Sequence, residues 1–257
     1  MPRFAANLTM LFTELPMRER FAAAAEAGFK GVEILFPYDI AAAEIYRSAV
    51  AAGLEMVLLN TPPPNWAGGP RGFAAVPGLE ERFQRDFERS LRVAQALRAR
   101  HIHVMAGVAE GPEALDTFRR NLAWAAERAP HASLTIEPIN RTDMPGYFLS
   151  DFDLAAEIIE GIAAPNLGLQ LDCYHARIIT GDMTACWRKV APLVRHIQIA
   201  GHPGRHEPDD GELDYPAFFA ELDDWGYRGW VSAEYHPARH SLSGLGWLRR
   251  ANDRATG

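Results

Sequence analysis

Short apolar runs alternate along the chain with longer segments that have helical spacing. The runs predict eight strands, at Arg3–Asn7, Val32–Phe36, Met56–Asn60, His101–Gly107, Ser133–Ile139, Leu167–His175, Val194–Ala200 and Trp230–Tyr235. Between them, segments such as Leu79–Arg100 repeat apolar residues every three or four positions, which is typical of one buried face of an α-helix. Asp39 and Asp151 each precede such a segment and are candidate N-caps.

Strict alternation of strands and helices favours an α/β fold with parallel strands and crossover helices. Eight such units in 257 residues match the size of a (β/α)₈ TIM barrel, so we expect residues 1–257 to form a single TIM-barrel domain. A doubly wound sheet is the structural alternative. It usually has a glycine-rich first turn, whereas neither GxGxxG nor GxxxxGKS/T occurs in this sequence.

Polar and apolar residues alternate in the last four predicted strands. Side chains of a barrel strand point in turn toward the helices and toward the barrel axis. If the apolar residues face the helices, the inward positions are Thr135, Glu137, Gly168, Gln170, Asp172, His196, Gln198, Ser232 and Glu234. The carboxyl ends of these strands, where barrel enzymes have their active sites, carry Glu137, Asp172, Gln198 and Glu234.

Three converging carboxylates would raise one another's pKa unless a cation lay among them. A divalent metal ion is the simplest such cation. The four groups at the strand ends offer carboxylate and amide oxygens, which are hard ligands and therefore indicate Mg²⁺ or Mn²⁺ rather than zinc or copper. The alternative is an inward polar layer held together by hydrogen bonds and water.

Composition and charge narrow the classes of partner. The net charge of −7 at pH 7 speaks against a general nucleic-acid surface, but a local arginine would still hold a small anionic substrate. The chain has no apolar run of the roughly 20 residues that a membrane span needs, and its N-terminus lacks a signal-peptide core. With only Cys173 and Cys186 and no CxxC pair, we expect a cytoplasmic protein without a disulfide framework. The sequence leaves open whether the protein forms a homo-oligomer.

Several stretches together resemble the hydroxypyruvate isomerase family, which includes 2-oxo-tetronate isomerases. They are IEPIN at Ile136–Asn140, LDCYH at Leu171–His175, HIQIAGHPGRHEP at His196–Pro208 with the following GELDY, and SAEYHP at Ser232–Pro237. The opening FAANLTMLFTE and the loop NTPPPNWAGGPRG extend the resemblance from near Met1 to about Pro237. It implies a metal-dependent sugar isomerase or epimerase barrel that is structurally related to endonuclease IV.

The resemblance also implies roles for individual residues. The family's metal-ligand positions correspond to Glu137, Asp172, Gln198 and Glu234. Glu137 and Glu234 also match its paired catalytic carboxylates, and His175 and Arg205 match positions that contact substrate oxygens. The implied reaction converts hydroxypyruvate to tartronate semialdehyde: one glutamate removes a proton from C3, an enediolate forms, and a proton returns at C2.

The substrate's carboxylate needs a cation, and we expect Arg205 or Arg71 to supply it because each follows a predicted strand end. Trp66, in the Pro/Gly-rich loop, is a candidate to close over the substrate. Two features depart from the family pattern. The loop reads Pro-Pro-Pro-Asn-Trp at Pro62–Trp66 instead of Pro-Pro-Gly-Asp-Trp, which bears on substrate size. Gln198 stands where epimerase relatives have histidine, which bears on metal affinity.

A 2-oxo-tetronate isomerase is the closest alternative, because it shares these residues and differs only in whether the pocket admits one more hydroxymethine carbon. A ketose epimerase is less favoured, as is a barrel that binds sugar acids without catalysis. An abasic-site endonuclease would need further metal ligands and a basic groove. A second metal site is conceivable in a loop that we interpret more simply as solvated, and its residues are His202, His206, Asp209 and Asp210. His103 is predicted to point inward near the site.

Overall fold

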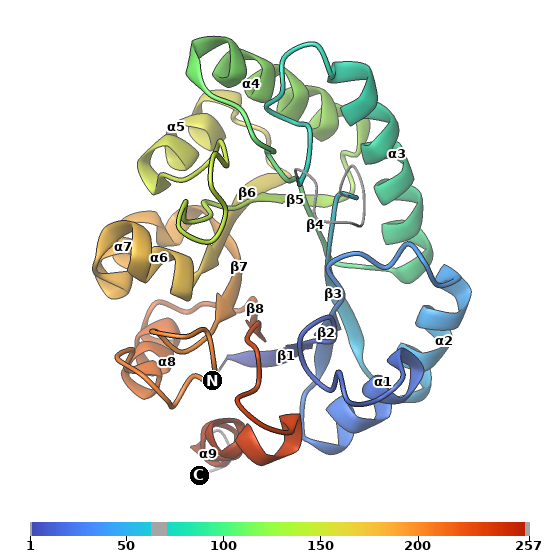
Figure 1. Ribbon diagram of the computed structural model, residues 1–257, viewed down its shortest axis with the longest axis vertical. Coiled ribbons are helices and arrows are strands. Elements are labelled where there is room, and N and C mark those ends of the chain that lie inside the picture. The colour runs from blue at the N-terminus through green and yellow to red at the C-terminus, as the bar shows by residue number, and fades with distance from the viewer. Residues whose placement is uncertain (1, 63–70, 255–257) are drawn as a thin grey trace.

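The computed structural model describes residues 2–62 and 71–254. Within these residues, eight parallel strands follow one another around a closed barrel, and the helices form a ring outside it (Figure 1). The strands are β1 (Arg3–Asn7), β2 (Gly31–Glu33), β3 (Glu55–Asn60), β4 (His101–His103), β5 (Ser133–Ile136), β6 (Leu167–Asp172), β7 (Val194–Ile199) and β8 (Trp230–Ala233). The predicted TIM barrel is confirmed.

The outer layer consists of amphipathic helices that bury apolar side chains against the strands. These helices are α1 (Met17–Glu26), α2 (Ala42–Ala51), α3 (Glu80–Leu97), α4 (Gly111–Arg128), α5 (Phe152–Ile162), α6 (Cys173–Thr180), α7 (Met183–Val190), α8 (Tyr215–Asp224) and α9 (Gly246–Arg254). Phe83 and Phe87 of α3, for example, belong to the same apolar cluster as Ile102 of β4. Among the described helices, none is both long enough and apolar enough to cross a membrane.

The ends of two helices test the predicted N-caps. The Asp151 side chain accepts hydrogen bonds from the backbone N–H groups of Asp153 and Leu154, at 2.7 and 3.0 Å, so this predicted cap of α5 is confirmed. The prediction for Asp39 is wrong. The N-cap position of α2 is Ala41, which makes no side-chain capping bond, because the helix begins two residues later than the position that Asp39 would cap.

The end of β6 differs from the prediction in a way that matters for the site. The strand ends at Asp172 rather than at His175, and α6 begins at Cys173. The Asp172 carboxylate accepts hydrogen bonds from the backbone N–H groups of Tyr174 and His175, at 2.8 and 3.4 Å, and so caps the helix. As a result, His175 lies in the first turn of a helix, on a rigid element rather than on a strand end.

Polar side chains occupy the barrel interior. β2 and β7 are not neighbours in the ring, so the 2.9 Å contact between Glu33 and His196 Nε2 must cross the inside of the barrel. Gln198 of β7 reaches the same carboxylate, with a 2.8 Å bond from its Nε2. The predicted inward direction of His196 and Gln198 is therefore confirmed.

Removing the helix cap at Asp151 should destabilise the protein without changing its fold. We expect Asp151→Ala to lower the free energy of unfolding by about 1 kcal/mol, and Asp151→Asn, which keeps a capping oxygen, to lower it much less. Urea unfolding of the three proteins measures both effects. Equal losses in the two variants would show that the capping bonds are not the source of the stability.

Candidate active site

A cavity of about 550 Å³ lies at the carboxyl ends of the barrel strands. Its wall takes residues from the ends of seven strands or from just beyond them, namely Leu35, Asn60, Met105, Glu137, His175, Arg205 and Glu234. Arg71 and Asp143 also line it. Three of the sequence-predicted site residues on the wall, Glu137, His175 and Glu234, are almost fully buried. The cavity is thus where the chain concentrates its buried polar groups.

Glu137, Asp172 and His175 form a group of potential metal ligands. One ligand atom from each lies within 4.8 Å of the others, and all three side chains are buried. Among residues 2–62 and 71–254, this is the only group of three or more His, Cys, Asp or Glu side chains with that geometry. The structure therefore brings two of the predicted ligands together and adds His175 to them.

Arg205 places a cation between two of the carboxylates. Its Nη2 lies 2.9 Å from Asp172 Oδ2 and 2.8 Å from Glu234 Oε1, and its guanidinium stacks over the Tyr174 ring at 5.1 Å. Burial lowers the pKa of Arg205, but Asp172 and Glu234 outweigh that effect and raise the pKa above its ordinary value. The residue has a positive φ of 56°, a backbone conformation that costs energy and is often found at functional sites.

Two amide groups connect Glu234 to a deeper carboxylate, Glu33. The Asn7 Nδ2 donates to Glu33 Oε1 and to Glu234 Oε2, at 2.9 Å in both cases. The Gln198 Nε2 donates to the same two oxygens. The backbone N–H of Thr9 donates to Asn7 Oδ1 at 2.9 Å, which fixes which end of that amide faces the glutamates. Glu234 is therefore held on one oxygen by two amides and on the other by Arg205.

Gln198 takes part in a second chain of hydrogen bonds. Its Oε1 accepts from Gln170 Nε2 at 2.7 Å, and the same nitrogen donates to Glu137 Oε2 at 2.9 Å. Thr135 in turn donates to Gln170 Oε1 at 3.1 Å. The oxygen of Gln198, which was predicted as a metal ligand, thus faces Gln170 in this arrangement, while its nitrogen faces Glu234.

Acidic side chains outnumber basic ones at this end of the barrel. Four of them are buried there: Glu33, Glu137, Asp172 and Glu234. Burial raises the pKa of Glu137 well above its ordinary value, and Asp172 and Glu234 raise it further. Burial also raises the pKa of Glu234 to about 8, although Arg205 acts in the opposite direction. Hard carboxylate oxygens fit a divalent cation, which would favour their ionised form.

Two histidines beside the carboxylates are neutral. Burial lowers the pKa of His175 to about 4 and that of His103 to about 3. His103 Nδ1 lies 3.4 Å from Glu137 Oε2 and 3.2 Å from Asn60 Oδ1, so it points inward as predicted. His175 Nδ1 lies 2.7 Å from the Asn140 amide nitrogen.

The remaining predicted residues lie at the rim or beyond the described chain. Arg71 is exposed on the cavity wall, with its guanidinium over the Phe36 ring at 5.7 Å. Trp66 lies outside the described residues. In the loop after β7, His202 Nδ1 is 3.4 Å from Glu212, and Asp209 pairs with Arg250. These surface contacts agree with the interpretation of that loop as solvated.

Sequence reasoning missed three polar residues of the site, Asn7, Glu33 and Asn140. Glu33 lies within the run Gly31–Phe36, where every other residue is apolar or glycine, and a single acid in such a run is a signal of a functional or paired carboxylate. Asn7 ends the first strand, and Asn140 belongs to the IEPIN motif. Their partners at the site, such as Glu234 for Asn7 and His175 for Asn140, come from distant parts of the chain, so spacing could not identify them.

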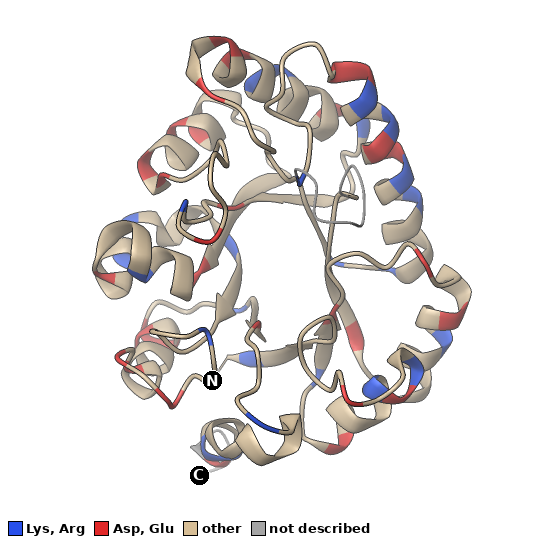
Figure 2. Cartoon of the chain, viewed as in Figure 1, with Lys and Arg blue, Asp and Glu red and all other residues tan. Residues whose placement is uncertain are grey.

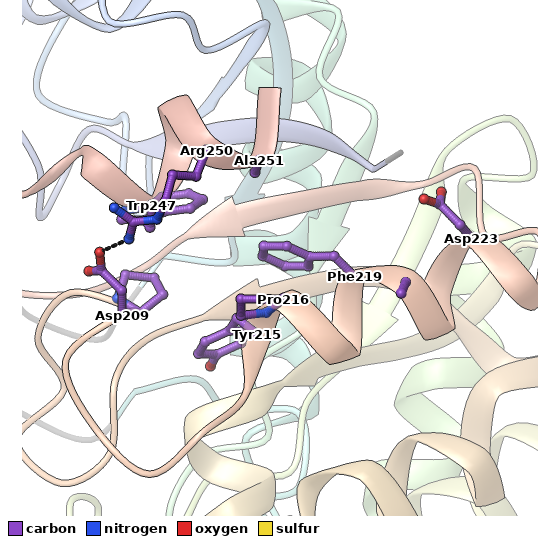
Figure 3. A pocket seen from close by; sticks show the side chains of 10 residues that line it. Asp209, Tyr215, Pro216, Phe219, Asp223, Trp247, Arg250 and Ala251 are labelled. Atoms are coloured by element: carbon purple, nitrogen blue, oxygen red, sulfur yellow. Dashed lines mark hydrogen bonds and ion pairs between the residues drawn. The ribbon is translucent and has the colours of Figure 1, made fainter. Parts of the chain in front are cut away.

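A second, apolar pocket of about 150 Å³ lies between α8 and α9 on the outside of the barrel (Figure 3). Phe219, Trp247 and Tyr215 line it, and the Asp209–Arg250 ion pair lies at its edge. The cavity at the strand ends brings buried carboxylates together with a buried histidine and an arginine, so we place the chemistry there.

Comparison with known proteins identifies one fold family and several close relatives. The sequence pattern of the xylose isomerase-like TIM barrel family matches residues 21–251. A 2-oxo-tetronate isomerase from Cupriavidus necator is 47% identical over 97% of this chain and 98% of its own length. The hydroxypyruvate isomerase of Escherichia coli is 37% identical over 96% of this chain and 98% of its own. A crystal structure described as an AP endonuclease, family 2, from Brucella melitensis has a TM-score of 0.94 and 46% identity, and covers 97% of this chain and 99% of that one.

The raised carboxylate pKa values predict how stability depends on pH. An unfolded glutamate has a pKa of about 4.3, so between there and about 8 the folded protein keeps a proton that the unfolded chain has released. The free energy of unfolding should therefore fall with rising pH, by up to about 1.4 kcal/mol per pH unit for each such group. Buried histidines act in the opposite direction, because an unfolded histidine binds a proton near its pKa of about 6.5 and burial lowers the pKa of four histidines in the folded protein, His101, His103, His175 and His196. Above about pH 7.5 the unfolded histidines are mostly neutral as well, so the carboxyl groups dominate the slope there.

Urea unfolding in the presence of a chelator, between pH 7.5 and 8.5, measures this slope. Glu137→Gln should have a shallower slope than the unchanged protein, and Glu157→Gln, which alters a carboxylate on the outer helix α5, should retain it. Parallel slopes for all three proteins would contradict the assignment. Added Mg²⁺ should stabilise the protein more at pH 8 than at pH 6.5, because it binds the ionised carboxylates.

Proposed function

The chain belongs to the xylose isomerase-like TIM barrel family, and from that premise we propose that it is an isomerase of small 2-oxo hydroxy acids that works through an enediolate. The observation that carries the proposal is the arrangement of Glu137 and Glu234. Both are buried carboxylates on the wall of one cavity, with a guanidinium and a neutral imidazole beside them. Isomerases that move a proton between adjacent carbons need such a pair of proton carriers.

We propose 2-oxo-tetronate as the preferred substrate, with hydroxypyruvate second. The relatives support this order, since the 2-oxo-tetronate isomerase is 47% identical to this chain and the hydroxypyruvate isomerase 37%. The two reactions share their chemistry. In both, C3 loses a proton, C2 gains one, and the hydroxyl proton of C3 moves to the oxygen on C2; the tetronate carries one further hydroxymethyl group on C3.

In the proposed mechanism the two glutamates divide the proton transfers. One removes the C3 proton, the C2–C3 bond becomes double as charge moves onto the C2 oxygen, and the other returns a proton to C2. A positioned base contributes about 10²–10⁴-fold to such a step. Asn7 and Arg205 hold Glu234 in place, while Gln170 contacts Glu137.

Charge on the substrate oxygens needs stabilisation as well as proton carriers. Mg²⁺ or Mn²⁺, held by Glu137, Asp172 and Glu234, would supply Lewis-acid stabilisation of that charge. The Gln198 amide would be a further ligand only with its oxygen turned from Gln170 toward the ion. The buried surplus of carboxylates supports this ion. Arg71 is our candidate for binding the substrate carboxylate, because Arg205 already contacts two carboxylates, whereas Arg71 is exposed at the cavity wall.

The name of the Brucella melitensis structure raises abasic-site endonuclease activity as an alternative. Two observations disfavour it here. The net charge is −7, and Figure 2 shows acidic and basic residues interspersed on the outer helices. The described residues also contain one group of potential metal ligands, where a multi-metal nuclease site would need more. We therefore propose a small anionic substrate and no nucleic-acid partner.

Proton NMR in D₂O tests the proposed function directly. With Mg²⁺ present, we expect the C3 proton signal of 2-oxo-tetronate to disappear as product forms, and the reaction to stop when a chelator removes the ion. Glu137→Gln and Glu234→Gln should each lose at least about 100-fold in kcat, because each removes a proton carrier. Glu157→Gln is the control. Near-normal turnover in either site variant would remove that residue from proton transfer, and silence with both acids would refute the proposal.

Arg71→Met should weaken substrate binding more than it slows the chemistry. Loss of a charge-assisted hydrogen bond predicts that KM rises by about tenfold or more while kcat changes little. Arg82→Met is a matched control, since Arg82 also lies over an aromatic ring, that of Phe73, but pairs with Asp86 outside the cavity. Steady-state kinetics gives both constants, and an unchanged KM would exclude Arg71 from carboxylate binding.

A further inference from the structure

Asn140 is a buried asparagine whose side chain contacts His175. It follows β5 in the IEPIN motif and has 1% of its surface exposed. Its Nδ2 lies 2.7 Å from His175 Nδ1. An imidazole nitrogen at this distance is either the acceptor of an amide N–H or the donor to an amide oxygen, and the two cases place the ring proton on different nitrogens.

The backbone decides between these two cases. The main-chain N–H of Asp143 lies 2.9 Å from Asn140 Oδ1, and a backbone N–H can only donate. The amide atom that faces it must therefore be oxygen, so the atom that faces His175 is nitrogen. The Asp143 carboxylate, 3.1 Å from Nδ2, accepts from the same nitrogen and supports this orientation. The amide is fixed from two sides.

The consequence for His175 is a single tautomer. Because Nδ1 accepts a hydrogen bond, it carries no proton, and the ring's N–H is on Nε2. Nε2 lies 3.6 Å from Asp172 Oδ2 and 3.8 Å from Glu137 Oε1, and His175 lines the cavity. The N–H thus lies beside the carboxylates of Asp172 and Glu137, at the cavity wall.

This tautomer bears on the role of His175. A histidine that binds a metal almost always donates its other ring N–H to an acceptor, which leaves the ligating nitrogen with a free lone pair. At His175 the other nitrogen receives a hydrogen bond instead, so Nε2 is a donor and has no lone pair to offer. His175 therefore lies within a group of potential metal ligands, but its hydrogen bonds are those of a donor and not those of a metal ligand.

We propose that Asn140 is a positioning residue that holds His175 in the Nε2–H tautomer. The contact with a substrate oxygen that the family resemblance implies for His175 is then a hydrogen bond donated to the C2 oxygen, and Nε2 has no lone pair for a metal ion. The substrate part of this inference rests on the proposed function. As the C3 proton leaves, negative charge grows on the C2 oxygen, and a fixed neutral donor stabilises it without giving up its own proton.

Nitrogen-15 NMR of the imidazole side chains tests the tautomer in the resting protein. The His175 signals are identified by their absence from His175→Gln, and they distinguish a proton on Nε2, on Nδ1 or on both. At pH 8 we expect Nε2 to be protonated and Nδ1 bare, both without and with added Mg²⁺. A proton on Nδ1, or loss of the Nε2 proton when Mg²⁺ is added, would overturn the proposal.

Asn140→Asp tests the positioning role. The new carboxyl group would lie beside that of Asp143, so the variant is studied at pH 8 and also in combination with Asp143→Asn, which removes that neighbour. An ionised carboxylate still accepts from the N–H of residue 143 but cannot donate to Nδ1, so the ring proton should move to Nδ1. We expect kcat to fall by about 10–100-fold, as for other residues that orient a reactive group, with KM nearly unchanged. Asn121→Ala is the control. It removes the hydrogen bond that another buried asparagine donates to the carbonyl of Ala74, and it leaves the bond to His175 intact.

The outcomes separate this proposal from the proposed function. An unmoved ring proton in Asn140→Asp, or a moved proton with unchanged kcat, overturns the role of Asn140. If Asn140→Asp does not fold, the NMR of the unchanged protein with and without Mg²⁺ still decides the tautomer and whether His175 binds the ion. If the unchanged protein exchanges no C3 proton with either acid, the proposed function fails, while the NMR result stands on its own.

Discussion

The burial of negative charge at one end of the barrel is the constraint on which the site depends. An ionised side chain that leaves water costs several kcal/mol unless charges or hydrogen-bond donors replace its solvation. Here Glu33, Glu137, Asp172 and Glu234 share a single guanidinium contact, from Arg205 to two of them. The remaining hydrogen bonds to these side chains within the described chain come from neutral donors, so ionisation of all four carboxyl groups calls for a further cation.

The closed barrel makes this arrangement possible because parallel strands bring their carboxyl ends into one ring. Asn7 pairs in register with Glu33 at the ends of β1 and β2, and Asp172 with Gln198 at β6 and β7. Contacts across the interior then connect strands that are not neighbours, as in the bond between Glu33 and His196. The apolar layer outside holds the strands rigidly, so the polar groups inside need little further ordering when a substrate binds.

The sequence predicted the barrel and the inward set of β5–β8 because a two-residue period is visible along each strand. It did not predict Glu33, whose strand is apolar on both faces, nor the position of Arg205, which depends on a left-handed backbone in an irregular loop. It also extended β6 into α6, because apolar spacing does not reveal that Asp172 caps a helix. The two-residue period of a strand shows which face of the sheet a residue occupies. Which side chain that residue contacts depends on how the strands are aligned in the barrel.

Two asparagines of the site have their side-chain amides oriented by the same kind of hydrogen bond. Asn7 and Asn140 each accept a backbone N–H a few residues further along the chain, from Thr9 and Asp143, and this bond turns their NH₂ groups toward the site. An amide suits such a place because it donates without carrying a charge that could titrate. A lysine there would neutralise a carboxylate and compete with a metal ion for it, whereas an amide orients the carboxylate or the imidazole and leaves its charge available for the reaction.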